Sequence, residues 1–254
     1  MKQIIACIPA RYQASRFPGK LLATLGDRPV IAHVVQRVQR ARSVGEVIVA
    51  TDDERIADAV RGLGATVKMT SQYHQSGTDR VAEAVRDIPC GIVVNVQGDE
   101  PFIEPESIDR AVHPLIVDPN CQLSTLVRPL RDPCELCDSS VVKVVRDADD
   151  WALYFSRSPI PFFRDLYPEP GCGLPQSVPD GVWAHIGLYV YRKRTLLELV
   201  NWGPCDLEKA EKLEQLRALY HGLRIRTVPV QGATIGIDTP DDLKRAEDIL
   251  AAGD

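Results

Sequence analysis

In the first half of the chain, short runs of β-branched apolar residues alternate with stretches that have the apolar period of an amphipathic helix. Strands that alternate with helices form parallel sheets, because each helix returns the chain to the edge where the next strand starts. The run 92–96 is almost purely apolar, as expected of a strand buried on both faces. The pattern therefore predicts an α/β protein with a mainly parallel sheet.

The predicted elements follow from these patterns. Strands are expected at 3–8, 46–50, 67–70, 92–96, 141–147, 152–157, 185–192 and 224–230. Helices are expected at 29–41, at 53–63 with Gly64 as the stop, after the loop 74–80, at 207–223 and at 240–252. Thr239 is the predicted cap of the last helix, with Pro240 at its first position and Asp242 completing a capping box.

Length and charge narrow the class of protein. The 254 residues suit one domain, 1–254, and the net charge of −5 argues against a general grip on nucleic acid. No apolar run is long enough for a bilayer, and no signal peptide is evident, so we expect a soluble cytoplasmic protein that does not bind membranes. Cys134 and Cys137 form a lone CxxC without further ligands at metal-like spacing, so they are interpreted as structurally incidental thiols.

Charged residues gather where predicted strands end. Arg11 and Lys20 follow the first strand and flank a Pro-Gly turn, which suits a polyphosphate. The stretch is not a Walker loop, because Lys20 is followed by Leu21. Asp99 follows the strand 92–96, and Asp238 precedes a helix that Thr239 already caps. Either carboxylate suits magnesium, and the ordinary alternative is a turn or cap residue. Together with the basic loop, the two carboxylates suggest metal-assisted nucleotidyl transfer.

Other polar positions are ambiguous by themselves. The loop 74–80 suits either a nucleotide contact at a helix N-terminus or an ordinary helix start with Ser76 or Thr78 as cap. His185 on an apolar strand, Arg157 after a strand, and Glu214-Gln215 on a predicted helix all have ordinary structural explanations. The segment 164–182 is rich in Pro and Gly and is interpreted as a surface loop.

Eight stretches occur in order along nearly the whole chain: IPARYQASRFPGK, HQSGTDR, VNVQGDEP, VVKVVRD, YFSRSPIPF, HIGLYVYR, LEKAEKLEQLR and GIDTPDDL. Together they resemble the motifs of the 3-deoxy-manno-octulosonate (Kdo) cytidylyltransferase family. The resemblance implies a three-layer, Rossmann-like nucleotide-diphospho-sugar transferase fold with a mixed, mainly parallel sheet. It also implies that CTP and Kdo react to CMP-Kdo and diphosphate for lipopolysaccharide synthesis, and that the protein is a homodimer with a dimerisation and sugar-pocket region in about 125–200.

The resemblance also implies roles for individual residues. Arg11 and Lys20 would bind the CTP phosphates and, with Asp99, form the catalytic group, while Asp99 and Asp238 would hold Mg²⁺. Residues expected to contact CTP are Arg11, Lys20, Ser76, Gly77, Arg80, Gln97 and Gly98. Residues expected to contact Kdo are Gln97, Arg157, His185, Tyr189, Glu214 and Gln215, with Arg157 suited to grip a carboxylate.

Two alternatives stay open at this point. One is an enzyme for a related acidic sugar, an 8-amino derivative of Kdo or a sialic acid. The other is a nucleotide-sensing module without catalysis, since a fold does not guarantee chemistry. A dehydrogenase is excluded, because no GxGxxG follows the first strand.

Overall fold

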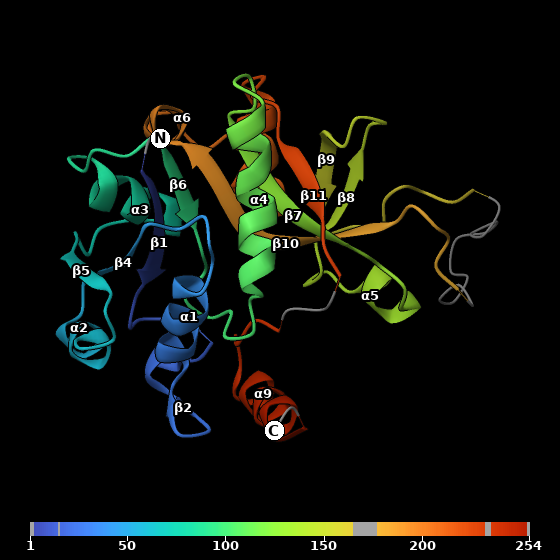
Figure 1. Ribbon diagram of the computed structural model, residues 1–254. Coiled ribbons are helices and arrows are strands. Elements are labelled where there is room, and N and C mark those ends of the chain that lie inside the picture. Colours follow the sequence, from blue (N-terminus) through green and yellow to red (C-terminus); the bar gives the residue numbers. More distant parts are fainter. Residues whose placement is uncertain (1–2, 15, 165–176, 232–234, 253–254) are drawn as a thin grey trace.

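In the described part of the chain, one sheet of nine strands forms the centre of the molecule (Figure 1). The computed structural model describes residues 3–14, 16–164, 177–231 and 235–252. The main strand order is β11-β7-β10-β6-β1-β4-β5, β8 pairs with β10, and β9 pairs with β8. The strands are β1 (Ile4–Ala10), β4 (Glu46–Thr51), β5 (Thr66–Met69), β6 (Ile92–Asn95), β7 (Leu123–Pro129), β8 (Lys143–Arg146), β9 (Ala152–Ser156), β10 (Trp183–Arg192) and β11 (Arg226–Pro229); β2 (Thr24–Leu25) and β3 (Arg28–Pro29) form a separate hairpin.

The predicted α/β class and mixed sheet are confirmed. β1 is parallel to β4 and to β6, β4 is parallel to β5, and β11 is parallel to β7. β10 runs antiparallel between β6 and β7. The strand predicted at 92–96 is β6, and it lies inside the sheet with all four of its residues buried.

Helices cover both faces of the sheet, which gives three layers. Alternate residues of β1 show the division: Ala6 and Ile8 pack with α1, α2 and α4, whereas Ile5 and Cys7 pack with α3, α6 and α8. Figure 1 shows α4 lying across one face. The helices are α1 (Val30–Gln39), α2 (Glu54–Val60), α3 (Gly77–Val85), α4 (Pro105–Val117), α5 (Pro133–Cys137), α6 (Lys193–Leu199), α7 (Asp206–Glu211), α8 (Gln215–Tyr220) and α9 (Pro240–Ala252), with a 3₁₀ turn η1 (Lys20–Leu22).

The single helix predicted at 207–223 is wrong. The structure has two short helices there, α7 and α8, separated at Lys212, which has the left-handed conformation (φ 55°). The apolar period continues through the break, so the sequence pattern does not reveal it. The helix predicted at 53–63 is also shorter, because Arg61, with φ −58° and ψ 131°, is not helical and ends α2 at Val60.

Several elements were not anticipated. β7, α4, α5 and α6 lie in stretches for which no element was predicted. Residues 165–176 of the predicted loop 164–182 lie outside the described part of the chain, while Val178 and Val182 at its far end pack with Leu130 and Leu136. Within the described residues, no helix is both long and apolar enough to cross a bilayer.

The start of α9 has the predicted capping box. The Asp242 carboxylate accepts hydrogen bonds from the backbone N–H groups of Asp238 (3.0 Å) and Thr239 (2.8 Å) and from the Thr239 hydroxyl (2.8 Å). In return, the Asp242 N–H donates to the Thr239 hydroxyl (3.2 Å). Burial raises the pKa of Asp242, but the bonds from Thr239 and Arg245 outweigh it and leave the pKa below its usual value. Asp242 therefore fixes the backbone beside Asp238.

His185 lies on β10 and pairs with β7. Its Nε2 is 2.8 Å from the Thr125 hydroxyl, and its ring meets Phe155 edge-on with centroids 5.1 Å apart. Burial lowers the pKa of His185 to about 3. The imidazole is therefore neutral in the folded protein at ordinary pH.

Replacing Asp242 by alanine removes the acceptor of the α9 box. We expect the free energy of unfolding to fall by about 1 to 2 kcal/mol, the usual cost of losing a helix cap. Urea denaturation followed by circular dichroism measures it. Asp241→Ala is the matched control, because Asp241 is an exposed carboxylate one residue away. Equal stability of the two variants would contradict the role given to Asp242.

His185 predicts a pH dependence of stability. Between its ordinary pKa of 6.5 and the folded value of about 3, the unfolded chain binds a proton that the folded protein does not. Stability should therefore fall with decreasing pH below about 6.5, by about 1.4 kcal/mol per pH unit from this group. Urea unfolding of the wild type and of His185→Gln from pH 8 to pH 4 isolates the contribution. Parallel curves for the two proteins would contradict it.

Candidate active site

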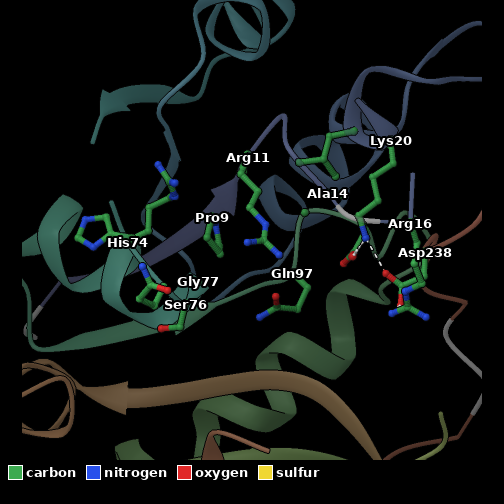
Figure 2. Close-up of a pocket in the computed structure, with 16 residues that line it drawn as sticks. Pro9, Arg11, Ala14, Arg16, Lys20, His74, Ser76, Gly77, Gln97 and Asp238 are labelled. Carbon is green, nitrogen blue, oxygen red and sulfur yellow. Dashed lines mark hydrogen bonds and ion pairs between the residues drawn. The ribbon is translucent and has the colours of Figure 1, made fainter. Parts of the chain in front are cut away.

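The carboxyl ends of neighbouring strands meet at one edge of the sheet. β1 ends at Ala10 opposite Thr51 of β4, and Cys7 of β1 pairs with Asn95, the last residue of β6. The loops that leave these strands enclose a cavity of about 270 Å³, here called cavity I (Figure 2). It is lined by Pro9, Ala10, Arg11, Ala14, Arg16, Lys20, Leu21, His74, Gln75, Ser76, Gly77, Arg80, Gln97, Gly98, Asp99 and Asp238.

The loop after β1 is closed on itself. The Gly19 N–H donates to the Tyr12 carbonyl (2.8 Å), and Gly19 has φ 74°, which disfavours residues with a Cβ. A Cβ on Gly19 would also lie 3.0 Å from the Tyr12 ring. The guanidinium of Arg55 also lies over this ring, 3.4 Å from the ring centroid. This closure brings Lys20 to the rim of cavity I.

Lys20 joins two carboxylates from distant segments. Its Nζ contacts Asp99, and it donates to Asp238 Oδ1 at 2.8 Å. The Ile237 N–H donates to the Asp99 carbonyl (2.9 Å), which places Asp238 beside Asp99. Burial lowers the pKa of Lys20, but the two carboxylates outweigh it and raise the pKa, so the ammonium is charged.

Asp99 and Asp238 suit a divalent cation. Both reach the same ammonium, so their oxygens converge on one small region at the rim of cavity I. Mg²⁺ in phosphate-handling sites uses one or two carboxylates and takes its other ligands from phosphates and water. No group of three or more His, Cys, Asp or Glu side chains that could hold a metal occurs among the described residues. The pair therefore fits a cation that arrives with a phosphate substrate.

The opposite side of cavity I is the start of α3 (Figure 2). The Ser76 hydroxyl caps the helix by accepting from the Asp79 N–H (3.1 Å), so both interpretations of the loop 74–80 are compatible with its position. Gly77 is packed against Pro9, since a Cβ there would lie 3.2 Å from the proline ring. Arg80 is buried and donates to Asp52 (2.9 Å) and Thr70 (2.6 Å). Its guanidinium is thus fixed at the cavity wall.

A second cavity of about 230 Å³, cavity II, adjoins the first. Gly77 and Gln97 line both cavities. Burial raises the pKa of Glu214 despite its bonds with Thr78 and Ser76. Gln215 is 6 % exposed, and its Nε2 has no hydrogen-bond partner among the described residues. The lining is Gly77, Thr78, Gln97, Leu123, Gly187, Tyr189, Tyr191, Leu199, Glu214, Gln215 and Ala218.

The structure brings most of the predicted site residues together. Cavity II has four of the predicted sugar contacts in its lining: Gln97, Tyr189, Glu214 and Gln215. His185 and Arg157 are in the lining of neither cavity. Cavity I includes every residue expected at CTP or the metal: Arg11, Lys20, Ser76, Gly77, Arg80, Gln97, Gly98, Asp99 and Asp238.

Arg157 lies away from the cavities. Its Nε donates to the Glu211 carbonyl (2.8 Å), Nη1 to the Ser139 carbonyl (2.7 Å) and Nη2 to the Lys212 carbonyl (3.5 Å). Each nitrogen of the guanidinium therefore already donates to the protein backbone. The predicted contact between Arg157 and a sugar stays a prediction.

Many residues of the linings had no individual role assigned from the sequence, among them Arg16, His74, Gly187 and Tyr191. Arg16 donates to Asp238 (2.8 Å), and His74 contacts Glu83. Arg16 lies inside the motif 8–20 and His74 inside the motif 74–80, and these positions could have identified them as lining residues. Gly187 and Tyr191 line cavity II, and the two-residue period of β10 places them on the same face as Tyr189. That period could have identified them.

The CxxC lies outside both linings. Cys134 and Cys137 are exposed on the short helix α5. The described residues place no third metal ligand with them. Nothing in this arrangement connects them with the cavities.

Comparison with known proteins identifies the family. The Cytidylyltransferase family model matches residues 5–225. The 3-deoxy-manno-octulosonate cytidylyltransferase of Geobacter sulfurreducens is 51 % identical over 245 residues, which are 95 % of this chain and 97 % of the relative. The enzyme of the same name from Solibacter usitatus is 44 % identical, covering 99 % of this chain and 96 % of the relative.

Solved structures agree. A CMP:2-keto-3-deoxy-manno-octonic acid synthetase complexed with CTP superposes with a TM-score of 0.89 at 37 % identity, covering 99 % of each chain. A 4-diphosphocytidyl-2C-methyl-D-erythritol synthase from Anaerococcus prevotii, at 17 % identity and a TM-score of 0.64, shares the fold over 98 % of this chain and 99 % of its own. With this fold and these relatives, the chain belongs to the 3-deoxy-manno-octulosonate cytidylyltransferase family of nucleotidyltransferases.

Proposed function

We propose that this protein activates Kdo by the reaction of CTP with Kdo to CMP-Kdo and diphosphate, as a step in lipopolysaccharide synthesis. One observation carries the proposal beyond family membership: cavity I, with its cations and paired carboxylates, adjoins cavity II at Gly77 and Gln97. A nucleotide triphosphate in the first and a sugar in the second would meet at this boundary. Two such neighbouring cavities are what a nucleotidyl transfer needs.

CTP is assigned to cavity I. Arg11 and Lys20 are the cations for its phosphates, and Figure 2 shows Arg11 reaching between the Ser76 side of the cavity and the Asp238 side. Ser76 and Gly77 at the start of α3 would frame the cytidine with Arg80. A Cβ on Gly98 would lie 3.1 Å from the Pro9 carbonyl, so glycine there keeps the cavity wall close to β1.

Mg²⁺ is the expected cofactor, held by Asp99 and Asp238. Bound there with the nucleotide, it would neutralise phosphate charge and lower the pKa of the attacking hydroxyl. In the reaction, the anomeric hydroxyl of Kdo loses its proton to solvent and attacks the α-phosphorus of CTP, and a new O–P bond forms as the bond to diphosphate breaks. Negative charge grows on the leaving phosphates, where Arg11 and Lys20 stabilise it.

Kdo is assigned to cavity II. Gln97 at the boundary, Tyr189 on β10, and Glu214 and Gln215 at the start of α8 are the polar groups expected to bind its hydroxyls. The Nε2 of buried Gln215 has no partner among the residues that the structure describes, which supports this, because a buried amide without a partner is costly and a sugar hydroxyl would satisfy it. His185 is in the lining of neither cavity. We expect it to affect sugar binding indirectly, because its ring makes a tilted contact with the Tyr189 ring, with 5.4 Å between the centroids.

The remaining parts of the proposal concern assembly and location. A homodimer that uses the region 125–200 and a cytoplasmic location are expected from the family resemblance. The 8-amino derivative of Kdo and sialic acid are the competing substrates.

The first test is diphosphate release from CTP and Mg²⁺ with Kdo, 8-amino-Kdo or sialic acid in parallel reactions. We expect release with Kdo, because six of the eight Kdo-type motifs contribute residues to the linings of the two cavities. A preference for the amino sugar would keep the mechanism and change the assignment of cavity II. If the folded protein binds CTP but releases no diphosphate with any of the three sugars, the proposal of an enzyme is wrong, and the protein is a nucleotide-sensing module.

Asp99→Asn tests the carboxylate pair. We expect turnover to fall at least about a hundredfold, as on loss of a group that stabilises developing charge. The free energy of unfolding should change by less than about 1 kcal/mol, since Lys20 keeps Asp238 as a partner. Asp248→Asn, an exposed carboxylate on α9, is the control. Near-normal turnover in Asp99→Asn would remove Asp99 from the metal site.

A further inference from the structure

The polar groups of cavity II depend on a break between two helices. α7 ends at Glu211, and α8 begins at Gln215. Between them Lys212 has φ 55° and ψ 44°, a conformation that residues with a Cβ rarely adopt. Such a residue persists only where its surroundings hold it. The break turns the chain so that Glu214 and Gln215 reach the cavity.

Arg157 holds this break from the end of β9. Its Nε donates to the Glu211 carbonyl (2.8 Å) and its Nη2 to the Lys212 carbonyl (3.5 Å). Carbonyls at a helix C-terminus lack partners within the helix, and a cation there is favourable. The Glu211 carboxylate in turn accepts hydrogen bonds from the backbone N–H of Arg157 (3.0 Å) and from the Ser156 hydroxyl (2.6 Å). The break is thus bonded to β9 from both directions.

The third contact of Arg157 is itself anchored. Its Nη1 donates to the Ser139 carbonyl (2.7 Å) in the turn before β8. Lys143 is fully buried, and its ammonium donates to the carbonyls of Asp138 (2.8 Å) and Val141 (2.7 Å) in the same turn. A buried ammonium needs such partners, and the turn is fixed by supplying them. Arg157 is therefore a link between this turn and the helix break.

A separate bond keeps α7 and α8 together without Arg157. The buried Arg217 of α8 donates twice to the Glu208 carboxylate of α7, at 2.8 and 2.6 Å. Loss of Arg157 should therefore leave both helices in place and release only the segment between them. This separates a positioning role from a general role in folding.

We propose that Arg157 is a positioning residue, which fixes the backbone at Lys212 and thereby holds Glu214 and Gln215 against the sugar in cavity II. This inference rests on the proposed function for the identity of the sugar. It differs from a direct grip of Arg157 on the Kdo carboxylate. In a direct grip the effect of Arg157 depends on the charge of the sugar, whereas positioning affects charged and neutral sugars alike.

The test compares Arg157→Ala and Glu211→Ala with wild type, using Kdo and its neutral C1 carboxamide. We expect both variants to raise the KM for either sugar by about ten- to a hundredfold, the scale of small displacements in a site. The ratio of the two KM values, and the KM for CTP, should stay at the wild-type level. Arg194→Ala, an exposed arginine paired with Glu198, is the control and should change neither sugar's KM.

A second readout does not need turnover. Backbone amides of 212–217 should exchange hydrogen at least about tenfold faster in both variants than in wild type, because the break is no longer held. If wild type turns over none of the sugars, the proposed function fails while this exchange still tests the positioning.

Two results would overturn the inference. One is an Arg157→Ala enzyme that loses affinity for Kdo and not for the carboxamide, while Glu211→Ala binds both normally. The other is unchanged exchange of 212–217 in Arg157→Ala. If Arg157→Ala fails to fold, the KM values and the hydrogen exchange of Glu211→Ala still test the positioning role.

Discussion

The ammonium of Lys20 holds together three segments that are far apart in the sequence. It bridges Asp99, which follows a central strand, and Asp238, which lies 218 positions further along the chain than Lys20. Two carboxylates at one place repel each other, and a cation between them removes that cost. The walls of cavity I depend on this arrangement, because the loop after β1, the end of β6 and the start of α9 meet there.

The antiparallel strand β10 brings cavity II next to cavity I. Inserted between β6 and β7, it places Tyr189 opposite Asn95, two residues before Gln97. A strand from the second half of the chain thus lies next to the strand end that serves cavity I. The two cavities adjoin because the sheet changes direction at this position.

Much of this could be predicted from local sequence. Apolar runs and helix periods are local properties, so β1, β4, β6 and α1 were expected close to their observed positions. The topology of a parallel sheet then places Arg11, Lys20 and Asp99 at one edge. The approach of Asp238 to Asp99 has no local signal, because it depends on a backbone bond between Ile237 and Asp99. The sequence offered both residues as magnesium ligands from their carboxylates and from the family resemblance, without showing how they meet.

The break at Lys212, in contrast, could not be predicted from local sequence. Residues 207–223 have a continuous helical period, and the sequence carries no glycine or proline at the break. The left-handed turn is stabilised by Arg157, which lies 54 positions before Glu211. A conformation imposed by such distant contacts cannot be predicted from a window of neighbouring residues. The orientation of Arg157 was unpredictable for the same reason.

The position of Asp238 also has a consequence for how the protein is made. Asp238 follows β11, so every strand of the sheet leaves the ribosome before the second carboxylate does. Closing a loop of this length is slow compared with forming local structure. During synthesis, the sheet and most of the walls of cavity I can therefore form while the carboxylate pair is still incomplete. Completion of the active site therefore coincides with docking of α9. A nascent chain can have the fold of a nucleotidyltransferase before Asp238 completes the pair of carboxylates in its active site.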